Sequence, residues 1–463
     1  MSDFMKKIHF LTTILASWVM LNIVACQQSN TTSQSDDNTI DSTATPDYKP
    51  KIDKNGLYNI AHLYKLPEFN SIEEALKNPQ NVYRLNLRKQ MLNKLPEEIA
   101  QFTNLQELNL SDNPIEELPE SLKNLKKIQI LHIGKTNLKE IPTVVYELPH
   151  LQVLNISGLL MAKLPETLSQ CTQLTSLDAD FCGLEEFSEV LLKMKTLERL
   201  SLKGNLINQL PQNIGTMESL AVLKLTENSI QQLPASFVKL KKLRSLDLSG
   251  NPLKNIPAEI SQLAQLKLLY LNNLKIETQD YSPVATLANL QELGMENNQI
   301  EKLPQDFFAK MVNLRTLKIK GNKITNLPTS INQCKYLQTL DISRNPDLDV
   351  STTVKMLNTS RLNRINLSGT KLNGDQWAEE LSTLKTLKIL QLSYNQFEEP
   401  EKALKKIILL NQLEELDISG SNLPLGNEIT EMKNLKRLKI NGLNEYEQNE
   451  LAKKLPNTKI ISI

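Results

Sequence analysis

The chain has 463 residues and a formal net charge of +1, from 53 Lys and Arg against 52 Asp and Glu. This balance excludes a strong overall field that would draw the protein to nucleic acid or to an anionic membrane surface, so a partner is expected to be recognised locally. The length alone would allow about three globular domains. Internal repetition replaces that expectation with one elongated array.

The first 25 residues have the composition of a targeting segment. Lys6 and Lys7 precede a mostly apolar run from Ile8 to Ala25, which Cys26 follows. Such a run predicts a signal peptide at residues 1–25, and its length also allows an uncleaved transmembrane anchor. Residues 26–51 contain almost no apolar side chains, so they predict a disordered tether, with a processed propeptide as the alternative.

Residues 52–81 differ in composition from the segments on either side. Ser71 and Glu74 have the spacing of a capping box at the start of a short helix, and Pro79 would end that helix. An amphipathic helix ahead of a repeat array can cover the exposed apolar end of the first unit. We therefore predict an N-terminal helical cap over residues 52–81.

From residue 82 to residue 463, one pattern recurs with a period of about 23 residues. In its clearest copy, Leu246 and Leu248 alternate with polar residues, which predicts a short strand with one buried face. Asn251 follows at the turn, where its amide can bond backbone groups, and Pro257 stands where a short helical turn could begin. About 16 units and one terminal strand result. Their first residues are Val82, Leu105, Ile128, Leu151, Leu174, Leu197, Leu220, Leu243, Leu266, Leu290, Leu314, Leu337, Leu362, Leu387, Leu413 and Leu435.

The motif L-x-x-L-x-L-x-x-N-x-L within this period resembles the leucine-rich-repeat superfamily. Its Leu-Pro-x-x-Ile half resembles the subclass of about 23 residues found in Ras-group and plant intracellular proteins and in many bacterial envelope proteins. The resemblance implies an α/β solenoid of horseshoe shape, with a parallel sheet on the concave face and short helices or turns on the convex face. Likewise, Ile23-Val24-Ala25-Cys26 resembles the lipobox of bacterial lipoproteins, which implies that Cys26 is the acylated residue.

No arrangement of residues in the sequence predicts catalysis. Cys171 and Cys334 lie seven units apart, roughly 34 Å at the spacing of parallel strands, so they cannot form a disulfide. Cys182 occupies the ninth position of its unit, which the register buries. The sequence has no Cys/His metal spacing, Gly-rich phosphate loop or Ser/His/Asp set. We therefore expect no enzyme activity, no cofactor and no metal.

The strand positions that face solvent are where a partner would bind. In stacked repeats, the second, third, fifth, seventh and eighth positions form one continuous surface. Apolar and aromatic residues among charges on such a surface are typical of protein interfaces, although single exposed Ile, Val and Tyr residues also occur for structural reasons. The candidate residues are Ile130, His132, Val153, Asp178, Asp180, Phe181, Val222, Lys224, Asp247, Leu268, Tyr270 and Tyr394.

Two groups of these residues fall on adjacent predicted strands. The first, from Ile130 to Phe181, is acidic with one histidine and predicts a cationic partner whose affinity falls as salt rises. The second, from Val222 to Tyr270, has both signs of charge. We expect Tyr270 to be its anchor, because a tyrosine supplies a large contact area at low entropic cost.

Three classes of function fit parts of this sequence. We expect a non-catalytic recognition or adhesion module, lipid-anchored to the bacterial cell envelope at the outer membrane or cell surface, that binds a protein or glycan and no nucleic acid. A cytoplasmic signalling scaffold of the Ras-group kind fits the repeat subclass but not the N-terminus. A ligase-type enzyme is the least favoured, because the repeats leave no room for a catalytic domain.

Overall fold

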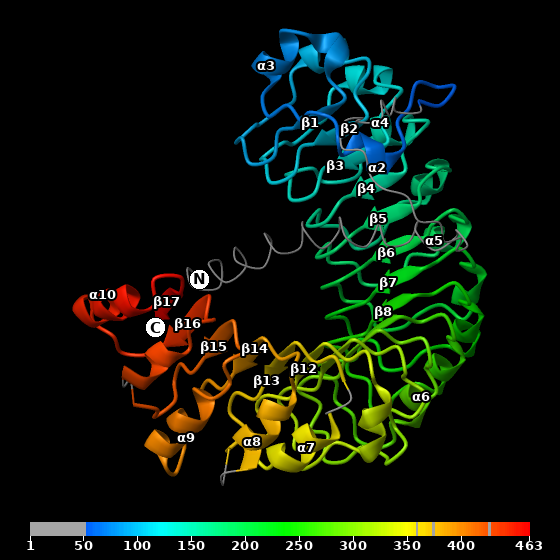
Figure 1. The fold of residues 1–463 in the computed structure, drawn as a ribbon. Helices are drawn as coiled ribbons and strands as arrows, with labels where there is room; N and C mark the ends of the chain where they lie inside the picture. Colours follow the sequence, from blue (N-terminus) through cyan, green and yellow to red (C-terminus); the bar gives the residue numbers. More distant parts are fainter. Residues whose placement is uncertain (1–51, 358–359, 373–375, 425–426) are drawn as a thin grey trace, which may run out of the picture. The chain divides into compact units, whose positions relative to one another are not determined.

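A computed structural model describes residues 52–357, 360–372, 376–424 and 427–463 (Figure 1). The chain divides into two compact units. The first consists of the chain up to Asn137 together with Pro142–Leu151, and the second consists of Leu138–Ile141 and Gln152–Ile463. The predicted signal peptide, Cys26 and the tether lie outside the described residues.

Each repeat contributes one short strand, and every strand runs parallel to its neighbours. The strand covers the third to fifth positions of the repeat, so the register predicted from the leucines is confirmed. The first unit contains β1 (Arg84–Asn86), β2 (Glu107–Asn109) and β3 (Ile130–His132). The second contains β4 (Val153–Asn155), β5 (Ser176–Asp178), β6 (Arg199–Ser201), β7 (Val222–Lys224), β8 (Ser245–Asp247), β9 (Leu268–Tyr270), β10 (Glu292–Gly294), β11 (Thr316–Lys318), β12 (Thr339–Asp341), β13 (Arg364–Asn366), β14 (Ile389–Gln391), β15 (Glu415–Asp417), β16 (Arg437–Ile440) and β17 (Lys459–Ser462).

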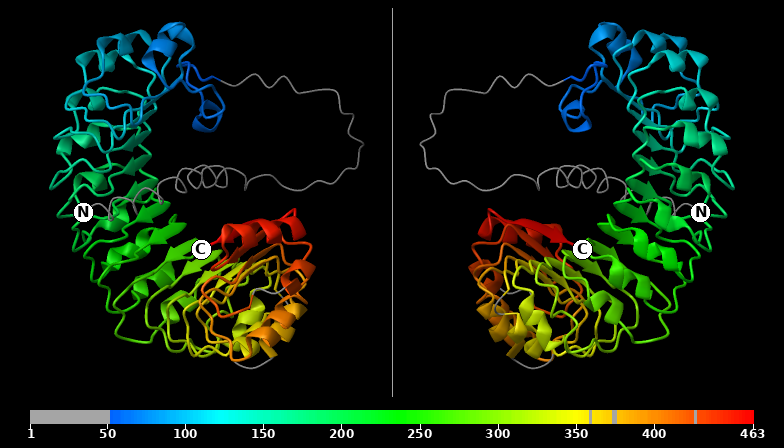
Figure 2. Two further views of the ribbon diagram at one scale, coloured as in Figure 1. Left: turned by 90° about the vertical axis from the view of Figure 1, so that its left-hand side faces the viewer. Right: turned by 90° about the vertical axis from the view of Figure 1, so that its right-hand side faces the viewer.

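The helical elements lie on the other side of each unit from the strands, as Figure 2 shows for the second unit. The α-helices of the first unit are α2 (Ile60–Leu63), α3 (Ile72–Leu76) and α4 (Thr143–Tyr146). Those of the second unit are α5 (Val190–Lys193), α6 (Ser282–Ala285), α7 (Val350–Met356), α8 (Gln376–Thr383), α9 (Pro400–Ile407) and α10 (Glu445–Lys454). The 3-10 helices are η1 (Pro79–Asn81), η2 (Glu97–Gln101), η3 (Glu120–Asn124), η4 (Glu166–Gln170), η5 (Ile214–Thr216), η6 (Ala235–Lys239), η7 (Ala258–Gln262), η8 (Thr329–Gln333) and η9 (Asn427–Glu431). α2 is an exception to this placement.

In most repeats the proline stands just before a short 3-10 helix rather than at the first position of an α-helix, and Pro142 stands just before the short α-helix α4. Pro257 is the N-terminal cap of η7. Its φ of −61° is the value that the proline ring imposes, and it is compatible with the extended backbone of the residue before the helical turn. After Leu337 the proline disappears and the helices lengthen to seven residues in α7 and eight in α9. The loss of the proline and the longer helices therefore occur in the same repeats, although the 3-10 helix η9 follows α9.

The asparagine at the ninth position bonds the backbone inside each unit. The Asn251 amide nitrogen donates to the carbonyls of Leu225 and Leu248 at 2.8 Å, and its oxygen accepts from the amide of Ile230 at 3.0 Å. Asn251 is 1% exposed. The same two carbonyl contacts recur at Asn113, Asn205, Asn228, Asn322, Asn345 and Asn395. The predicted asparagine ladder is therefore present, and it satisfies carbonyls that leave the sheet.

The residue before that asparagine has a left-handed backbone in every repeat. The eighth position has φ between 53° and 80°, whether it is glycine or another residue. Glycine adopts this conformation freely, while other residues are strained by roughly 1–2 kcal/mol. The non-glycine residues at this position are Lys89, Asp112, Lys135, Phe181, Glu227, Asn273, Asn297, Arg344 and Tyr394.

The N-terminal cap has two parts: one closes the edge of the sheet, and the other lies over the strand side of the first unit. Helix α3 begins at the predicted cap, where Ser71 Oγ accepts from the amide of Glu74 at 3.1 Å. Before it, Phe69 pairs with the edge strand β1: its amide donates to Arg84 O, and its carbonyl accepts from Asn86 N. These contacts close the edge of the sheet. The segment from Gly56 to Leu66, which includes α2, lies instead over the strand side of the first unit (Figure 1).

Candidate binding face

The strand face of the second unit carries three predicted site residues side by side. Lys224, Asp247 and Tyr270 occupy the fifth positions of β7, β8 and β9, and they are directly opposite one another in the pairing register. Val222 and Leu268 occupy the third positions of the outer two strands. All five are half-buried. The second predicted group is thus brought together as expected.

Lys224 lies among three carboxylates. Burial lowers the pKa of its ammonium group and Arg199 lowers it further, while Asp178, Asp180 and Asp247 act in the opposite direction. The three carboxylates oppose this lowering of the pKa, and they share the neighbourhood of Lys224 with a second cation, Arg199. The face therefore offers both signs of charge within a few strands, which favours a partner with matching charges of both signs.

Tyr270 packs across the neighbouring strand. A Cβ built on Gly294 of β10 would lie 3.0 Å from Cδ1 of Tyr270, so the ring covers this glycine. Burial raises the pKa of the Tyr270 hydroxyl well above its usual range, and a hydrogen bond with Glu292 adds to the effect. Glu292 in turn pairs with Lys318 at 2.7 Å. The Tyr270 ring is held in place while part of it stays accessible, as an anchor residue requires.

The acidic members of the first predicted group are largely bonded within the protein. Asp178 pairs with Arg199 at 3.5 Å. Asp180 accepts from the hydroxyl of Ser201 at 2.6 Å and from the amide of Lys203 at 2.8 Å, and burial raises the pKa of its carboxyl. Asp180 is therefore mainly structural.

Two aromatic residues at the left-handed eighth position are exposed. Phe181 is 50% exposed and Tyr394 is 68% exposed. Lys203 Nζ lies 5.4 Å from the centre of the Phe181 ring, a cation–π contact. Val153, on β4, is half-buried.

Ile130 is buried, which corrects the prediction that it lies open on the strand face. Its exposure is 0%. The reason is the Gly56–Leu66 segment: the Tyr58 amide donates to Gln106 Oε1 at 2.9 Å, and Gln129, the residue before Ile130, donates to the Tyr58 carbonyl at 2.9 Å. The segment therefore occupies the second and third positions of the first repeats.

His132, two residues further along β3, is half-buried. Ile130 and His132 belong to the first unit, while the other members of the first predicted group belong to the second.

The described residues offer no metal centre or reactive thiol. No group of three or more His, Cys, Asp or Glu side chains among them could hold a metal ion. Cys171, Cys182 and Cys334 are buried and free, and burial raises the pKa of their thiols to about 11, 11 and 12, respectively. Thiols with such values remain protonated and inert near neutral pH. Within the described ranges, none of the helices is long and apolar enough to cross a membrane.

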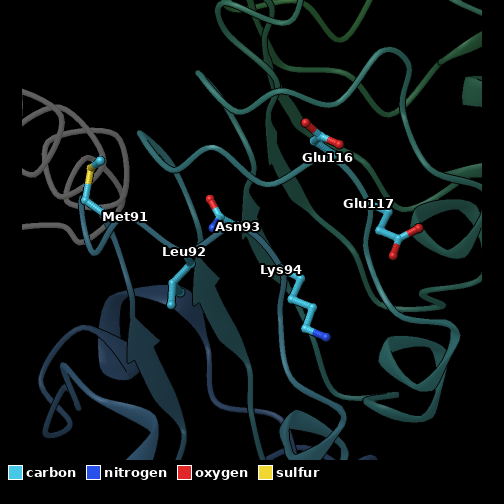
Figure 3. A pocket seen from close by; sticks show the side chains of 6 residues that line it. All are labelled: Met91, Leu92, Asn93, Lys94, Glu116 and Glu117. Carbon is cyan, nitrogen blue, oxygen red and sulfur yellow. The ribbon is translucent and has the colours of Figure 1, made fainter.

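One hollow lies in the first unit, and none of the predicted site residues lines it. It has a volume of about 680 Å³ and is lined by Met91, Leu92, Asn93, Lys94, Glu116 and Glu117. Figure 3 shows that these side chains point in different directions rather than toward one centre, and that Met91 points away from the others. The hollow is open to solvent, so it lacks the enclosure of a small-molecule site.

Three features of the structure are together specific for one architecture. They are the short parallel strands, the buried asparagine at every regular turn, and the helical turns opposite the strands. Family models agree: a leucine-rich-repeat region matches residues 243–457, and two further leucine-rich-repeat models match residues 195–253 and 104–125. The chain is built of leucine-rich repeats. No curated protein matches its sequence.

Solved leucine-rich-repeat structures are similar over most of the chain. A protein of this class from Leptospira interrogans is 27% identical, with a TM-score of 0.57 over 85% of this chain and 99% of that chain. An internalin of Listeria monocytogenes is 23% identical, with a TM-score of 0.52 over 74% and 88%.

The ectodomain of the Arabidopsis thaliana receptor kinase GASSHO1/SCHENGEN3, solved in complex with Casparian strip integrity factor 2, is also similar. It is 22% identical, with a TM-score of 0.52 over 85% of this chain and 51% of that chain. At this identity, the internalin and the receptor kinase show the fold alone.

Some partners of the predicted site residues were not themselves predicted. Arg199, Glu292 and Lys318 shape the charge around Lys224 and Tyr270, yet they were not among the candidates. They stand at third and fifth positions, so the same register could have found them. The occlusion of Ile130 has no such signal, because the covering segment lies outside the repeats.

Proposed function

We propose that this protein is a recognition module that binds a protein or glycan partner on the strand face of the second unit, with Tyr270 as the anchor. The observation that carries the proposal is the register of β7, β8 and β9, which places Lys224, Asp247 and Tyr270 side by side and half-accessible. Leucine-rich repeats are in general non-enzymatic binding scaffolds, and solenoids bind along extended faces of this kind.

The side chains of this face and its open shape both favour a macromolecular partner. The three aligned side chains supply a cation, an anion and an aromatic ring, which suits an interface with a small buried anchor and a polar surround. Of the two hollows found among the described residues, one lined by residues 91–117 and the other by residues 372–406, neither lies on this face to enclose a small ligand. Among similar structures, the receptor kinase was solved with Casparian strip integrity factor 2, which supports a protein or peptide partner.

The test compares capture by matched variants of the immobilised protein. Extracts of cell-surface material are passed over wild type, Tyr270→Ala, and a control, Tyr446→Ala, whose side chain is 73% exposed on α10 away from the strand face. A species captured by wild type and by the control, but about 30-fold more weakly by Tyr270→Ala, fits a hot spot of about 2 kcal/mol. Equal capture by all three folded variants refutes the anchor.

We further propose that a lipid on Cys26 anchors the protein to the bacterial cell envelope, at the outer membrane or cell surface. The support is the lipobox-like Ile23-Val24-Ala25-Cys26 after an apolar run. Cys26→Ser should abolish incorporation of labelled palmitate, and globomycin, which blocks cleavage of lipoprotein signals, should cause the uncleaved form to accumulate. Palmitate incorporation into Cys26→Ser refutes the anchor. An unlipidated cytosolic wild type would favour the signalling-scaffold alternative.

A further inference from the structure

One edge of the second unit carries cations without carboxylates. The edge is formed where the chain enters each strand, from about the twentieth position of one repeat to the second position of the next. Five consecutive segments, 239–244, 262–267, 286–291, 310–315 and 333–338, contain no Asp or Glu. We call Lys241, Lys242, Lys267, Lys310, Arg315 and Lys335 the basic edge. The net charge of +1 does not reveal this local cluster, because acidic residues elsewhere in the chain offset its charge.

Backbone hydrogen bonds fix these segments in one row. The amide at the second position of each repeat donates to the carbonyl at the second position of the repeat before it. This ladder runs from Arg244 through Lys267, Gln291 and Arg315 to Gln338, with each N···O distance 2.8 Å. Neighbouring strands are about 4.8 Å apart, so the basic edge is a line of cations roughly 20 Å long.

The charges on this line are available to an external partner. Lys241, Lys242, Lys310, Arg315 and Lys335 are exposed, and Lys267 is half-buried. None of the six forms an ion pair with a carboxylate of the described residues, whereas many lysines elsewhere in the unit do, as Lys254 does with Glu277 at 3.1 Å. Unpaired cations in a row repel one another, so an anionic partner would relieve that repulsion.

Apolar side chains project from the same edge. Val312 and Tyr336 occupy the twenty-third positions of successive repeats, next to Lys310 and Lys335, and they are 45% and 46% exposed. Arg361 stacks on the Tyr336 ring at 5.2 Å. The opposite edge, where the chain leaves the strands, carries both signs of charge, with exposed carboxylates at Glu277, Asp280, Glu301 and Asp347.

We propose that the basic edge docks on the headgroup surface of an anionic lipid bilayer. Lysine and arginine near such a surface gain attraction from its negative potential, and tyrosine settles at the boundary between headgroups and acyl chains. A sulfated or carboxylated glycan would match the cations but would leave Val312 and Tyr336 without an apolar partner. This combination of a cationic row with protruding apolar side chains favours lipid over glycan.

Docking by this edge is independent of the proposed binding face and of a lipid on Cys26. The basic edge lies at the entrance of the strands, while the binding face uses fifth-position side chains within them. A bilayer contact along the edge would leave the strand face of the second unit directed sideways, and so free to meet a partner. Failure of one proposal leaves the other standing.

The test places a fluorescent label on the edge of the full chain in a Cys26→Ser background. Tyr336→Cys is labelled with an environment-sensitive dye, and Leu206→Cys, which is 59% exposed where the chain leaves β6, is the matched control. The buried native thiols do not compete for the dye, because their pKa is raised to about 11 or above. Vesicles of phosphatidylcholine are compared with vesicles containing phosphatidylglycerol, with and without lipids that carry a quencher.

The expected result is a blue shift and lipid quenching at residue 336 on the anionic vesicles only, reversed by high salt, with no change at residue 206. Neutralising Lys242, Lys267 and Lys310 with Gln should raise the half-maximal lipid concentration about a hundredfold, at about 1 kcal/mol per residue. The same change at Lys275, Lys302 and Lys323 on the opposite edge should have little effect. An aqueous label at residue 336 on anionic vesicles, equal effects of both triple variants, or a response to soluble heparin but not to vesicles would overturn the proposal.

Discussion

The two units share one repeat register, yet their strand faces differ in what covers them. In the first unit, the chain's own Gly56–Leu66 segment lies over the second and third positions, and Ile130 is 0% exposed. In the second, Val222 and Leu268 stand at the same third position and remain half-exposed. The register therefore decides the side of the sheet on which a residue lies, while availability depends on segments outside the repeats.

Alkaline pH should distinguish the units most strongly, because all described thiols lie in the second. The pKa of Cys171 and Cys182 is raised from 9.0 to about 11, and that of Cys334 to about 12, because burial disfavours the thiolate. The unfolded chain ionises first, so the stabilisation is complete below pH 9. It is lost as pH rises to about 11 for Cys171 and Cys182 and to about 12 for Cys334. The expected loss is about 3 kcal/mol for each of the first two thiols and about 4 kcal/mol for Cys334.

Urea unfolding at pH 8 to 11 measures this loss, and a variant with alanine at all three positions is the reference. The difference in unfolding free energy between wild type and the reference should shrink above pH 9. In the first unit, the corresponding group is Tyr64, whose pKa burial raises to about 12, so its contribution changes only above pH 10. Parallel pH curves for wild type and reference would contradict the thiol assignment.

The third position gives the most direct test of the covered face. Ile130→Ala should lower the free energy of unfolding by about 2 to 4 kcal/mol, because it leaves a cavity under the Gly56–Leu66 segment. Val222→Ala, at the same position of β7, should lower it by less than about 1 kcal/mol, because that side chain is already half in water. Equal losses in urea unfolding would show that the two faces are equally covered.

Substitution in the buried asparagine ladder of the second unit should also lower the free energy of unfolding. Asn251→Leu removes two donors and one acceptor from a buried turn, so the carbonyl of Leu248 and the amide of Ile230 lose this partner, while the Leu225 carbonyl keeps its bond from Asn228 at 3.0 Å. The expected loss is about 1 to 3 kcal/mol. Leu274→Ala is the control, because this ninth-position side chain only packs. An unchanged unfolding midpoint for Asn251→Leu would mean that the ladder contributes nothing to stability.

Much of the fold could be predicted because it repeats. The strands, the inward asparagines, the turns after proline and the helix capped by Ser71 each follow from local spacing, which the backbone geometry converts directly into structure. The burial of Ile130 could not be predicted, because it depends on hydrogen bonds between residues up to 71 positions apart in the chain, with no periodic signal.

The positions of the candidate site residues on their strands could be predicted, but the contacts of their side chains could not. The register placed Tyr270 beside Asp247 and Lys224, as the structure confirms. It could not show that the ring covers Gly294, since that depends on side-chain direction. The basic edge escaped prediction for a different reason: a net charge of +1 averages over the whole chain, while the cations gather where successive repeats stack.

The left-handed eighth position links neighbouring repeats through their evolution. Phe181 and Tyr394 each lie over the eighth-position glycine of the next repeat, where a Cβ on Gly204 or Gly420 would come within 2.3 or 2.6 Å of the ring. Any side chain at these glycines would displace the ring and strain its own backbone. Each aromatic and its glycine are therefore expected to vary as a pair in related proteins. A repeat duplicated without its neighbour would separate each aromatic from the glycine that leaves room for its ring.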